Sequence, residues 1–152
     1  MHGVVPATIC GTHVDPRLTR ALVQPGDAWH EYSRVDRSEA ITAPCLILSG
    51  TNELLSFRFA WRPVQTDLMY LAKDTGEVSG ITDPKAIEFQ YKTLVGIDGA
   101  ISQAPCKTKN GNYFTLTLQL PLIKVTDRSR RGDIERFMRV YFSATVATLG
   151  CS

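Results

Sequence analysis

The sequence predicts an α+β domain, in which an antiparallel sheet of two β-hairpins, with four to six strands in all, is covered on one face by helices. Two observations carry this prediction. In both halves of the chain a stretch of alternating apolar residues follows a turn signal, at 53–63 and at 113–121. The chain then closes with an amphipathic helix at 133–149, whose apolar stripe needs a sheet face to cover. Its 152 residues fit a single domain, 1–152.

The clearer hairpin runs from Ala104 to Pro121. Asn110 and Gly111 form a strong two-residue turn signal, because both residue types tolerate a positive φ. Polar and apolar residues alternate after the turn, which places four apolar side chains on one face of a strand: Phe114, Leu116, Leu118 and Leu120. Pro121 ends the ladder, since it has no N–H to donate.

An earlier hairpin, from Ala43 to Pro63, repeats this order. Both contain Ala-Pro-Cys, a short strand, a turn with Gly and Asn, an alternating strand and a proline. The residues expected to face inward are Leu55, Phe57, Phe59 and Trp61.

Each hairpin follows an Asp-Pro pair, in which Asp would cap a helix and proline would take its first position. Helices are therefore predicted over 15–23 and 83–95. The order helix, strand, strand then occurs twice, at 15–63 and 83–121, which predicts an internal αββ duplication. Coincidence is the alternative, because hairpins and Asp-Pro helix starts are both common.

The closing helix over 133–149 has the most regular pattern. Its apolar residues recur at helical spacing over about four turns, and they are Ile134, Phe137, Met138, Tyr141, Phe142, Val146 and Leu149. Gly150 ends the helix. The connecting segments favour an edge strand over 32–36, a short helical face over 64–73 and a brief strand over 77–81.

Four cysteines, at Cys10, Cys45, Cys106 and Cys151, stand beside turn formers or strand starts. Their spacing does not fit a zinc or redox site. An even number at the edges of elements predicts two disulfides and an oxidising compartment, the alternative being four reduced thiols in a cytosolic protein. Of the three possible pairings we expect Cys10–Cys45 and Cys106–Cys151, since each bridge would staple one half of the chain.

Composition and charge exclude several classes of function. A net charge of +2 is too small to indicate a nucleic-acid partner, and no run of about 18 apolar residues is present to span a membrane. The first nine residues have neither a basic start nor a long apolar core. For an exported protein, the signal or membrane anchor is therefore expected to be missing from this chain.

The sequence does not indicate an enzyme, a metal site or a cofactor. His2, His13 and His30 lack further metal ligands at suitable spacing and are expected to be solvated. The motifs of α/β-hydrolases, P-loop proteins, zincins and Rossmann domains are missing. The carboxylates of Asp27 and Glu31 are expected to be solvated charges rather than an acid–base pair.

The candidate binding residues are Arg128, Arg130, Arg131 and Trp29. The three arginines form the main basic cluster of a nearly neutral chain, and arginine forks suit carboxylates and phosphates. They predict an exposed turn that docks a protein or cell-envelope partner; a merely solvated turn is the alternative. Trp29 follows Pro-Gly-Asp in a polar connector and is the aromatic residue most expected to be exposed.

Several short motifs resemble small secreted or membrane-anchored actinobacterial domains with four cysteines and unknown function. They are Cys10-Gly11-Thr12, an Asp-Pro helix start, a cysteine entering a hairpin and a closing helix that ends on Gly150-Cys151. The resemblance covers most of the chain and brings no catalytic residues. It implies an extracytoplasmic location and an α+β sandwich.

Two functions of different classes follow. The first is an extracytoplasmic, non-enzymatic interaction module, and the second is a small ligand-binding or hydrolase domain with a site between helix and sheet. A cavity lined by Phe57, Trp61, Phe137 and Tyr141 would favour the second function, whereas a solid core there would favour the first.

Overall fold

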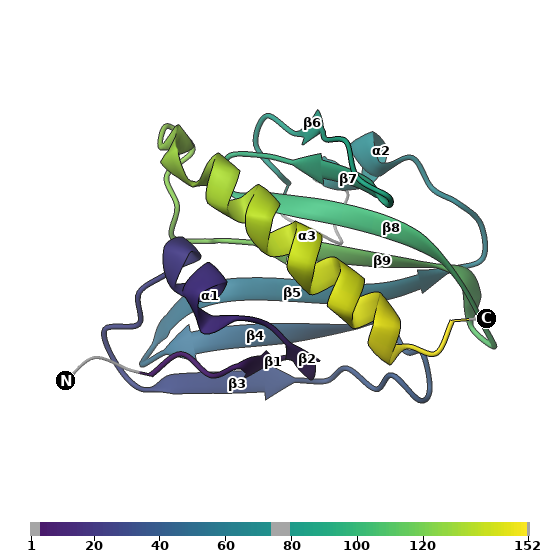
Figure 1. The fold of residues 1–152 in the computed structure, drawn as a ribbon, viewed down its shortest axis with the longest axis horizontal. Helices are drawn as coiled ribbons and strands as arrows, with labels where there is room; N and C mark the ends of the chain where they lie inside the picture. Colours follow the sequence, from purple (N-terminus) through teal and green to yellow (C-terminus); the bar gives the residue numbers. More distant parts are fainter. Residues whose placement is uncertain (1–3, 74–79, 152) are drawn as a thin grey trace.

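A computed structural model describes residues 4–73 and 80–151. Its main element is a seven-stranded antiparallel sheet with the order β3-β4-β5-β9-β8-β7-β6 (Figure 1). The strands are β3 (Trp29–Ser33), β4 (Ala43–Ser49), β5 (Asn52–Arg62), β6 (Lys85–Ala86), β7 (Lys92–Val95), β8 (Gly99–Thr108) and β9 (Gly111–Gln119). β1 (Thr8–Ile9) and β2 (Thr12–His13) form a separate two-stranded sheet. The α+β class is confirmed, but the sheet is larger than two hairpins.

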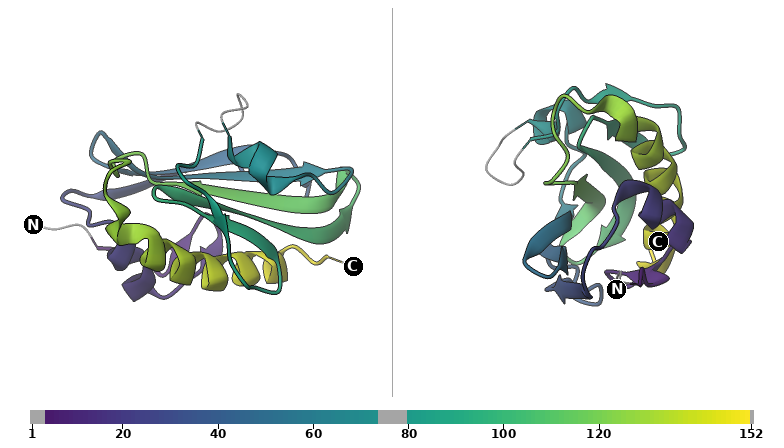
Figure 2. Two further views of the ribbon diagram at one scale, coloured as in Figure 1. Left: turned by 90° about the horizontal axis from the view of Figure 1, so that it is seen from above. Right: turned by 90° about the vertical axis from the view of Figure 1, so that its left-hand side faces the viewer.

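The helices lie on both sides of the sheet (Figure 2). α3 (Arg131–Thr148) crosses one face with α1 (Pro16–Leu22) beside it, and η1 (Arg128–Arg130), a 3₁₀ turn, leads into α3. α2 (Leu68–Ala72) packs on the opposite face against β7 and β8. The expectation of helices on one face is corrected by α2. None of the helices in the described chain has the length and apolar character that a bilayer crossing requires.

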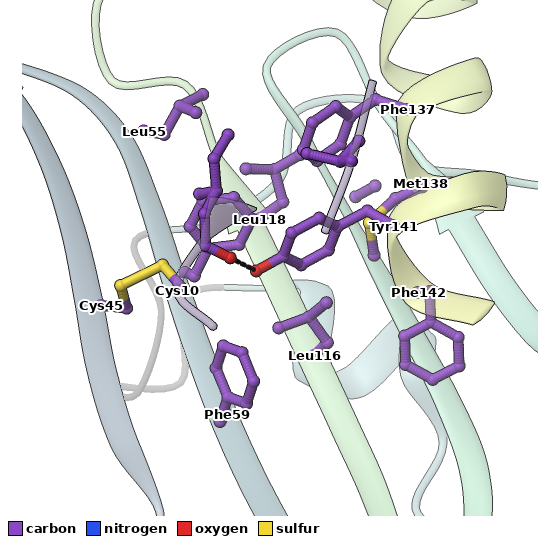
Figure 3. Packing of buried hydrophobic residues seen from close by; sticks show 14 of the residues in the cluster. Cys10, Cys45, Leu55, Phe59, Leu116, Leu118, Phe137, Met138, Tyr141 and Phe142 are labelled. Atoms are coloured by element: carbon purple, nitrogen blue, oxygen red, sulfur yellow. Dashed lines mark hydrogen bonds between the residues drawn. A yellow bond between two sulfur atoms is a disulfide. The ribbon is translucent and has the colours of Figure 1, made fainter. Parts of the chain in front are cut away.

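Aromatic side chains fill the space between α3 and the sheet (Figure 3). The ring centroid of Tyr141 lies 5.0 Å from that of Phe57 and 5.1 Å from that of Phe137. The inward-facing residues predicted on β5 and β9 are buried. The buried apolar residues of α3 are Ile134, Phe137, Met138, Tyr141 and Phe142. Burial of each large apolar side chain stabilises the fold by roughly 1.5–3 kcal/mol, so α3 is an integral part of the core.

Both predicted hairpins are present, as β4–β5 and β8–β9. In the second, Thr108 pairs with Gly111, so the turn residues are Lys109 and Asn110 rather than Asn110 and Gly111. None of these four residues has a positive φ. Gly111 is required for another reason: a Cβ atom here would lie 2.6 Å from the carbonyl oxygen of Arg62 on β5.

The helix predicted over 83–95 is wrong, because this stretch forms β6, an irregular segment and β7. Asp83 has a φ of 50°, whereas a helix-capping residue takes an extended conformation. Ile87, Phe89 and Tyr91 are partly buried and alternate with exposed residues. Their period is therefore two rather than 3.6. Tyr91 packs edge-on against a phenylalanine ring of α3, with the centroids 5.2 Å apart.

The weaker predictions have mixed outcomes. β3 lies earlier than the edge strand predicted over 32–36, and α2 is shorter than the helical face predicted over 64–73. The strand predicted over 77–81 falls mostly outside the described residues, and residues 80–81 are not in a strand.

The first copy of the proposed αββ repeat has its helix. α1 begins as predicted, with Asp15 as its cap and Pro16 in its first position. In the second copy, at 83–121, short strands stand where a helix was expected. The order of elements therefore differs between the two halves.

The predicted disulfides, Cys10–Cys45 and Cys106–Cys151, are both present. The first joins the β1–β2 turn to β4, and the second joins β8 to the chain just after α3. In the loop-entropy model each contributes roughly 4 kcal/mol. Two disulfides are consistent with an oxidising, extracytoplasmic environment.

Candidate functional site

The predicted binding residues lie at opposite edges of the sheet. The arginines belong to η1 and to the first position of α3, near the β6 edge, whereas Trp29 begins β3 at the other edge. The Trp29 side chain is partly buried against the core, and its Nε1 atom is buried without a hydrogen-bond partner. These residues therefore do not form one site, and Trp29 is less exposed than expected.

Arg131 holds two segments together. Its Nη2 atom donates to Oδ2 of Asp83 at 2.9 Å and to the Asp83 carbonyl oxygen at 3.0 Å, and its Nη1 atom donates to the carbonyl oxygen of Val95 at 2.8 Å. The side chain is 25% exposed. These bonds tie the start of α3 to both ends of the β6–β7 segment. The sequence predicted an exposed arginine turn and gave no indication of this structural role.

Arg128 and Lys85 approach the same carboxylate at longer range. Arg128 Nη1 lies 3.6 Å and Lys85 Nζ lies 3.8 Å from Asp83 Oδ2, and these two side chains are 70% and 66% exposed. Arg130 is half-buried, and its Nη1 atom lies 3.5 Å from the hydroxyl of Ser129. With Arg131, three cationic groups surround one carboxylate, which leaves this edge with positive charge.

An apolar groove lies between α2 and the β6–β7 segment, and we call it the α2 groove. It is half-open, with a volume of about 480 Å³, within the range of roughly 300–1,000 Å³ typical of ligand sites. Its apolar lining consists of Leu68, Met69, Ala86, Ile87, Phe89, Tyr91 and Leu94. Its polar lining consists of Thr66, Asp67, Gln90, Lys92 and Thr93.

The α2 groove continues into a smaller hollow of about 250 Å³ that shares Gln90, Tyr91 and Lys92 with it. Gln103 on β8 holds the chain that leads into α2. Its Oε1 atom accepts from the Thr66 N–H at 3.1 Å, and its Nε2 atom donates to the Thr66 carbonyl oxygen at 2.9 Å. Because Gln103 is buried, this pair of bonds fixes one wall of the groove to the sheet.

Exposed apolar side chains lie in α2 and in the chain just before it, and one of them, Met69, lines the groove. Val64, Met69 and Tyr70 are 65%, 39% and 61% exposed. α2 is one short turn in which Leu68 and Leu71 are buried, so Met69 and Tyr70 between them face outward. In the sequence, this surface is indicated by four consecutive apolar residues at 68–71. Consecutive residues of a helix point to different sides, so one buried face cannot cover all four.

A larger hollow of about 670 Å³ lies beside β5, β9 and the chain that follows Gly80. Three of its polar side chains, Thr82, Asp98 and Gln119, bond to the protein itself. The Asp98 carboxylate accepts from the N–H and the hydroxyl of Thr82 at 2.8 and 3.1 Å, and Gln119 Nε2 donates to the Gly80 carbonyl oxygen at 3.1 Å. These bonds attach the connection before β6 to the sheet.

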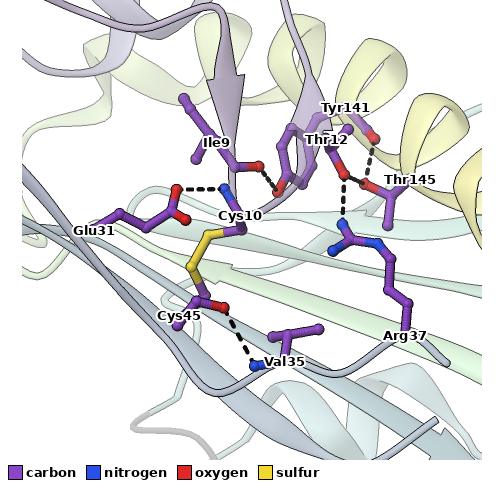
Figure 4. The surroundings of a disulfide bond; sticks show 10 residues. Ile9, Cys10, Thr12, Glu31, Val35, Arg37, Cys45, Tyr141 and Thr145 are labelled. Atoms are coloured by element: carbon purple, nitrogen blue, oxygen red, sulfur yellow. Dashed lines mark hydrogen bonds between the residues drawn. A yellow bond between two sulfur atoms is a disulfide. The ribbon is translucent and has the colours of Figure 1, made fainter. Parts of the chain in front are cut away.

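Arg37, which no sequence pattern singles out, bonds to residues of β2 and α3, and Figure 4 shows its bond to Thr12 of β2. Its Nη2 atom donates to Thr12 Oγ1 at 2.8 Å, and its Nε atom donates to Thr148 Oγ1 at 3.0 Å. The guanidinium lies 5.0 Å from the ring centroid of Phe59, and burial lowers the pKa of Arg37. A cation is favourable at the C-terminal end of a helix such as α3. Arg37 therefore stabilises the contact of the chain after β3 with β2 and with the end of α3.

Within the described residues, the one grouping with metal-ligand geometry is Cys10, Glu31 and Cys45. Its two sulfur atoms form a disulfide, so they offer no thiolate to a metal. The Glu31 carboxylate accepts from the backbone N–H of Cys10 at 2.7 Å (Figure 4). This grouping is therefore a structural contact between β3 and the β1–β2 turn.

No protein-family model, curated protein or solved structure matches this chain. The α2 groove and the neighbouring positive edge are therefore assigned from their own geometry and chemistry.

Proposed function

We propose that this protein is an extracytoplasmic, non-enzymatic binding module that holds an apolar side chain of a protein partner in the α2 groove. The observation that carries the proposal is an open apolar groove beside exposed apolar side chains of the same short helix. Clustered exposed apolar surface often marks a protein contact site. In such contacts a few anchor side chains seated in pockets supply most of the binding energy.

The shape of the groove favours a protein partner over a diffusible small molecule. Small-molecule sites bury most of the ligand surface, whereas the α2 groove is only half enclosed. Met69 in its wall is flexible and polarisable, which suits contact with an irregular partner surface. Asp67 and Lys92 supply charges of both signs at the rim, as is usual around the apolar centre of an interface.

The alternative, a ligand-binding or hydrolase site between helix and sheet, receives less support. The rings of Phe57, Phe137 and Tyr141 are in contact where such a site would lie below α3. Trp61 likewise packs on Phe114, with ring centroids 5.1 Å apart. A solid core of this kind favours the interaction module.

The proposed extracytoplasmic location is supported by the two disulfides, which persist in oxidising compartments. A partner exposed at the cell envelope or outside the cell would meet the protein there. Positive charge at Lys85 and Arg128, near β6, would mainly raise the rate of association with an acidic surface.

The experiment uses side-chain probes rather than an unknown partner. ¹⁵N-labelled protein is titrated with N-acetyl-tryptophanamide and with N-acetyl-leucinamide, and amide chemical shifts are followed. We expect saturable shifts confined to 66–69 and 86–94, with dissociation constants in the millimolar range because each probe supplies a single anchor. Scattered or non-saturable shifts would overturn the proposal.

A matched pair of variants sharpens the test. Met69→Asp places a carboxylate in the groove wall and is expected to weaken probe binding at least about tenfold, since the probe would have to desolvate a charge. Val140→Asp makes the same change at an exposed apolar residue of α3 and is expected to leave binding unchanged. Equal effects of the two variants would contradict a site at α2.

A further inference from the structure

We infer that the open edge of β3 is a second interaction surface, which takes a basic, extended segment of another polypeptide as an eighth strand of the sheet. β3 lies at the end of the strand order opposite to the α2 groove. The inference goes beyond the proposed function, because it concerns different residues and a different mode of recognition, β-strand addition.

The register of β3 shows which backbone groups face the edge. The N–H of Arg34 donates to the Pro44 carbonyl, and the N–H of Gly50 donates to the Ala28 carbonyl. Hydrogen-bonded pairs alternate along an antiparallel ladder, so His30 and Tyr32 bond to β4. The residues between them, Trp29, Glu31 and Ser33, direct their N–H and C=O groups away from β4. Within the described chain these six groups have no hydrogen-bond partner.

Edge strands are usually protected by proline, by a bulge, by being very short or by charged side chains. β3 lacks the first three protections, because it spans five residues, contains no proline and pairs with β4 in unbroken register; its one carboxylate is that of Glu31. The opposite edge strand, β6, has two residues and follows Pro84. Four of the five residues of β3 are exposed, and its β1–β2 neighbour belongs to a separate sheet. The β3 edge is thus the more accessible template.

The charge around β3 indicates what kind of strand fits. Residues 27–39 contain four carboxylates and two arginines, a net charge of 2 − 4 = −2, on a chain of net charge +2. Arg34 stacks on Tyr32 with its Cζ atom 5.8 Å from the ring centroid, and Arg37 bonds inward to Thr12. Glu31 therefore lies centrally on an acidic edge. A cationic residue opposite it would form a favourable cross-strand pair.

A second copy of this chain fits the edge less well. In the symmetric pairing that uses all six free backbone groups, Glu31 would stand directly opposite Glu31 of the second copy. Like charges in this position are destabilising. A separate segment with lysine or arginine opposite Glu31 avoids this repulsion.

The test titrates the protein with the peptide acetyl-Thr-Val-Lys-Val-Thr-amide at millimolar concentrations. Amide hydrogen exchange is measured residue by residue. Slower exchange is expected at Trp29, Glu31 and Ser33, and no change at His30 and Tyr32, whose N–H groups already bond to β4. This alternating pattern is specific to strand addition. Absence of the pattern would overturn the inference.

Charge is tested with a peptide that carries glutamate in place of lysine and with the variant Glu31→Gln, which keeps an acceptor for the Cys10 N–H. The lysine peptide is expected to bind about three- to tenfold more tightly at low salt, and Glu31→Gln to remove most of this difference, as for an exposed ion pair. Glu88→Gln, an exposed carboxylate near β7, is the matched control. Equal binding of both peptides would overturn the basic character of the segment.

Self-association is measured in the same samples by analytical ultracentrifugation. If the free protein forms dimers and shows the alternating protection without peptide, the second copy is the occupant and the inference of a basic segment is wrong. The α2 groove probes report on 66–69 and 86–94, so failure at β3 and failure at α2 are seen separately.

Discussion

The guanidinium of Arg131 bonds to the Asp83 carboxylate and to the Val95 carbonyl, whereas Arg128 reaches the same carboxylate only at 3.6 Å. Two arginines of one short cluster therefore have different roles. The half-buried one fixes the start of α3 to the β6–β7 segment, and the exposed one leaves its charge available to a partner. Sequence spacing alone could not separate them, because both stand in the same basic stretch.

Replacing Arg131 with alanine is expected to lower the free energy of unfolding by about 1–3 kcal/mol, because a carboxylate and two carbonyl groups lose their donor. The matched control, Arg128→Ala, is expected to change it by less than about 0.5 kcal/mol, as for most exposed residues. Urea unfolding at constant pH measures both values. Losses below about 0.5 kcal/mol in both variants would show that the cluster is a uniformly solvated turn.

Tyr141 gives the fold a dependence on alkaline pH. Its buried hydroxyl donates to the carbonyl oxygen of Ile9 at 2.8 Å, and burial raises the pKa of Tyr141 above its ordinary value of 10.0. The unfolded chain loses this proton near pH 10 while the folded chain keeps it. The stability due to the raised pKa is therefore complete below about pH 10 and is lost as the pH rises further.

Tyr141→Phe is expected to cost about 1–2 kcal/mol at neutral pH, since the Ile9 carbonyl loses its donor. It should also reduce the fall in Tm between about pH 9 and pH 11, because the phenylalanine has no proton to lose. Thermal unfolding of both proteins at the two pH values tests this. An unchanged slope would assign the alkaline loss to other groups.

At the residue scale, the hydrogen-bond partners of single side chains could not be predicted where they lie far apart in the sequence. Arg37 bonds to Thr148 across 111 positions, and Arg131 bonds to Asp83 across 48. Such contacts exist only after the sheet has formed. The disulfide pairing could be predicted correctly, because four cysteines allow only three pairings and one bridge in each half of the chain was the expected choice.

At the scale of elements, local patterns predicted β4, β5, β8, β9 and α3 correctly, since their periodicity and their burial agree. The stretch 83–95 was misjudged because its apolar residues satisfy a helical spacing and an alternating spacing at once. The stretch forms extended structure because β7 pairs with β8 and Tyr91 packs on α3. The α2 groove was missed for the same reason, because one of its walls is this segment.

At the scale of the whole molecule, the two hairpins are joined by the pairing of β5 with β9, which makes one continuous sheet. Sequence patterns define strands but not this neighbour order, so the addition of β3 at one edge and of β6–β7 at the other was not predictable. The resulting arrangement places the α2 groove and the acidic β3 edge at opposite sides of one disulfide-bonded scaffold. Two partners could therefore bind without competing for space.

This scaffold depends on α3, which supplies one side of the core. A chain ending at Gly132 is expected not to fold, because it loses apolar burial worth about 10 kcal/mol or more at roughly 25 cal/mol per Å², against a net stability of about 5–15 kcal/mol for many domains. The control is a Cys106→Ser chain ending at Leu149, which lacks the second disulfide but keeps the helix. It should fold with a lower Tm. Circular dichroism melts compare the two, and a cooperative transition of the shorter chain near that of the control would show that α3 is peripheral.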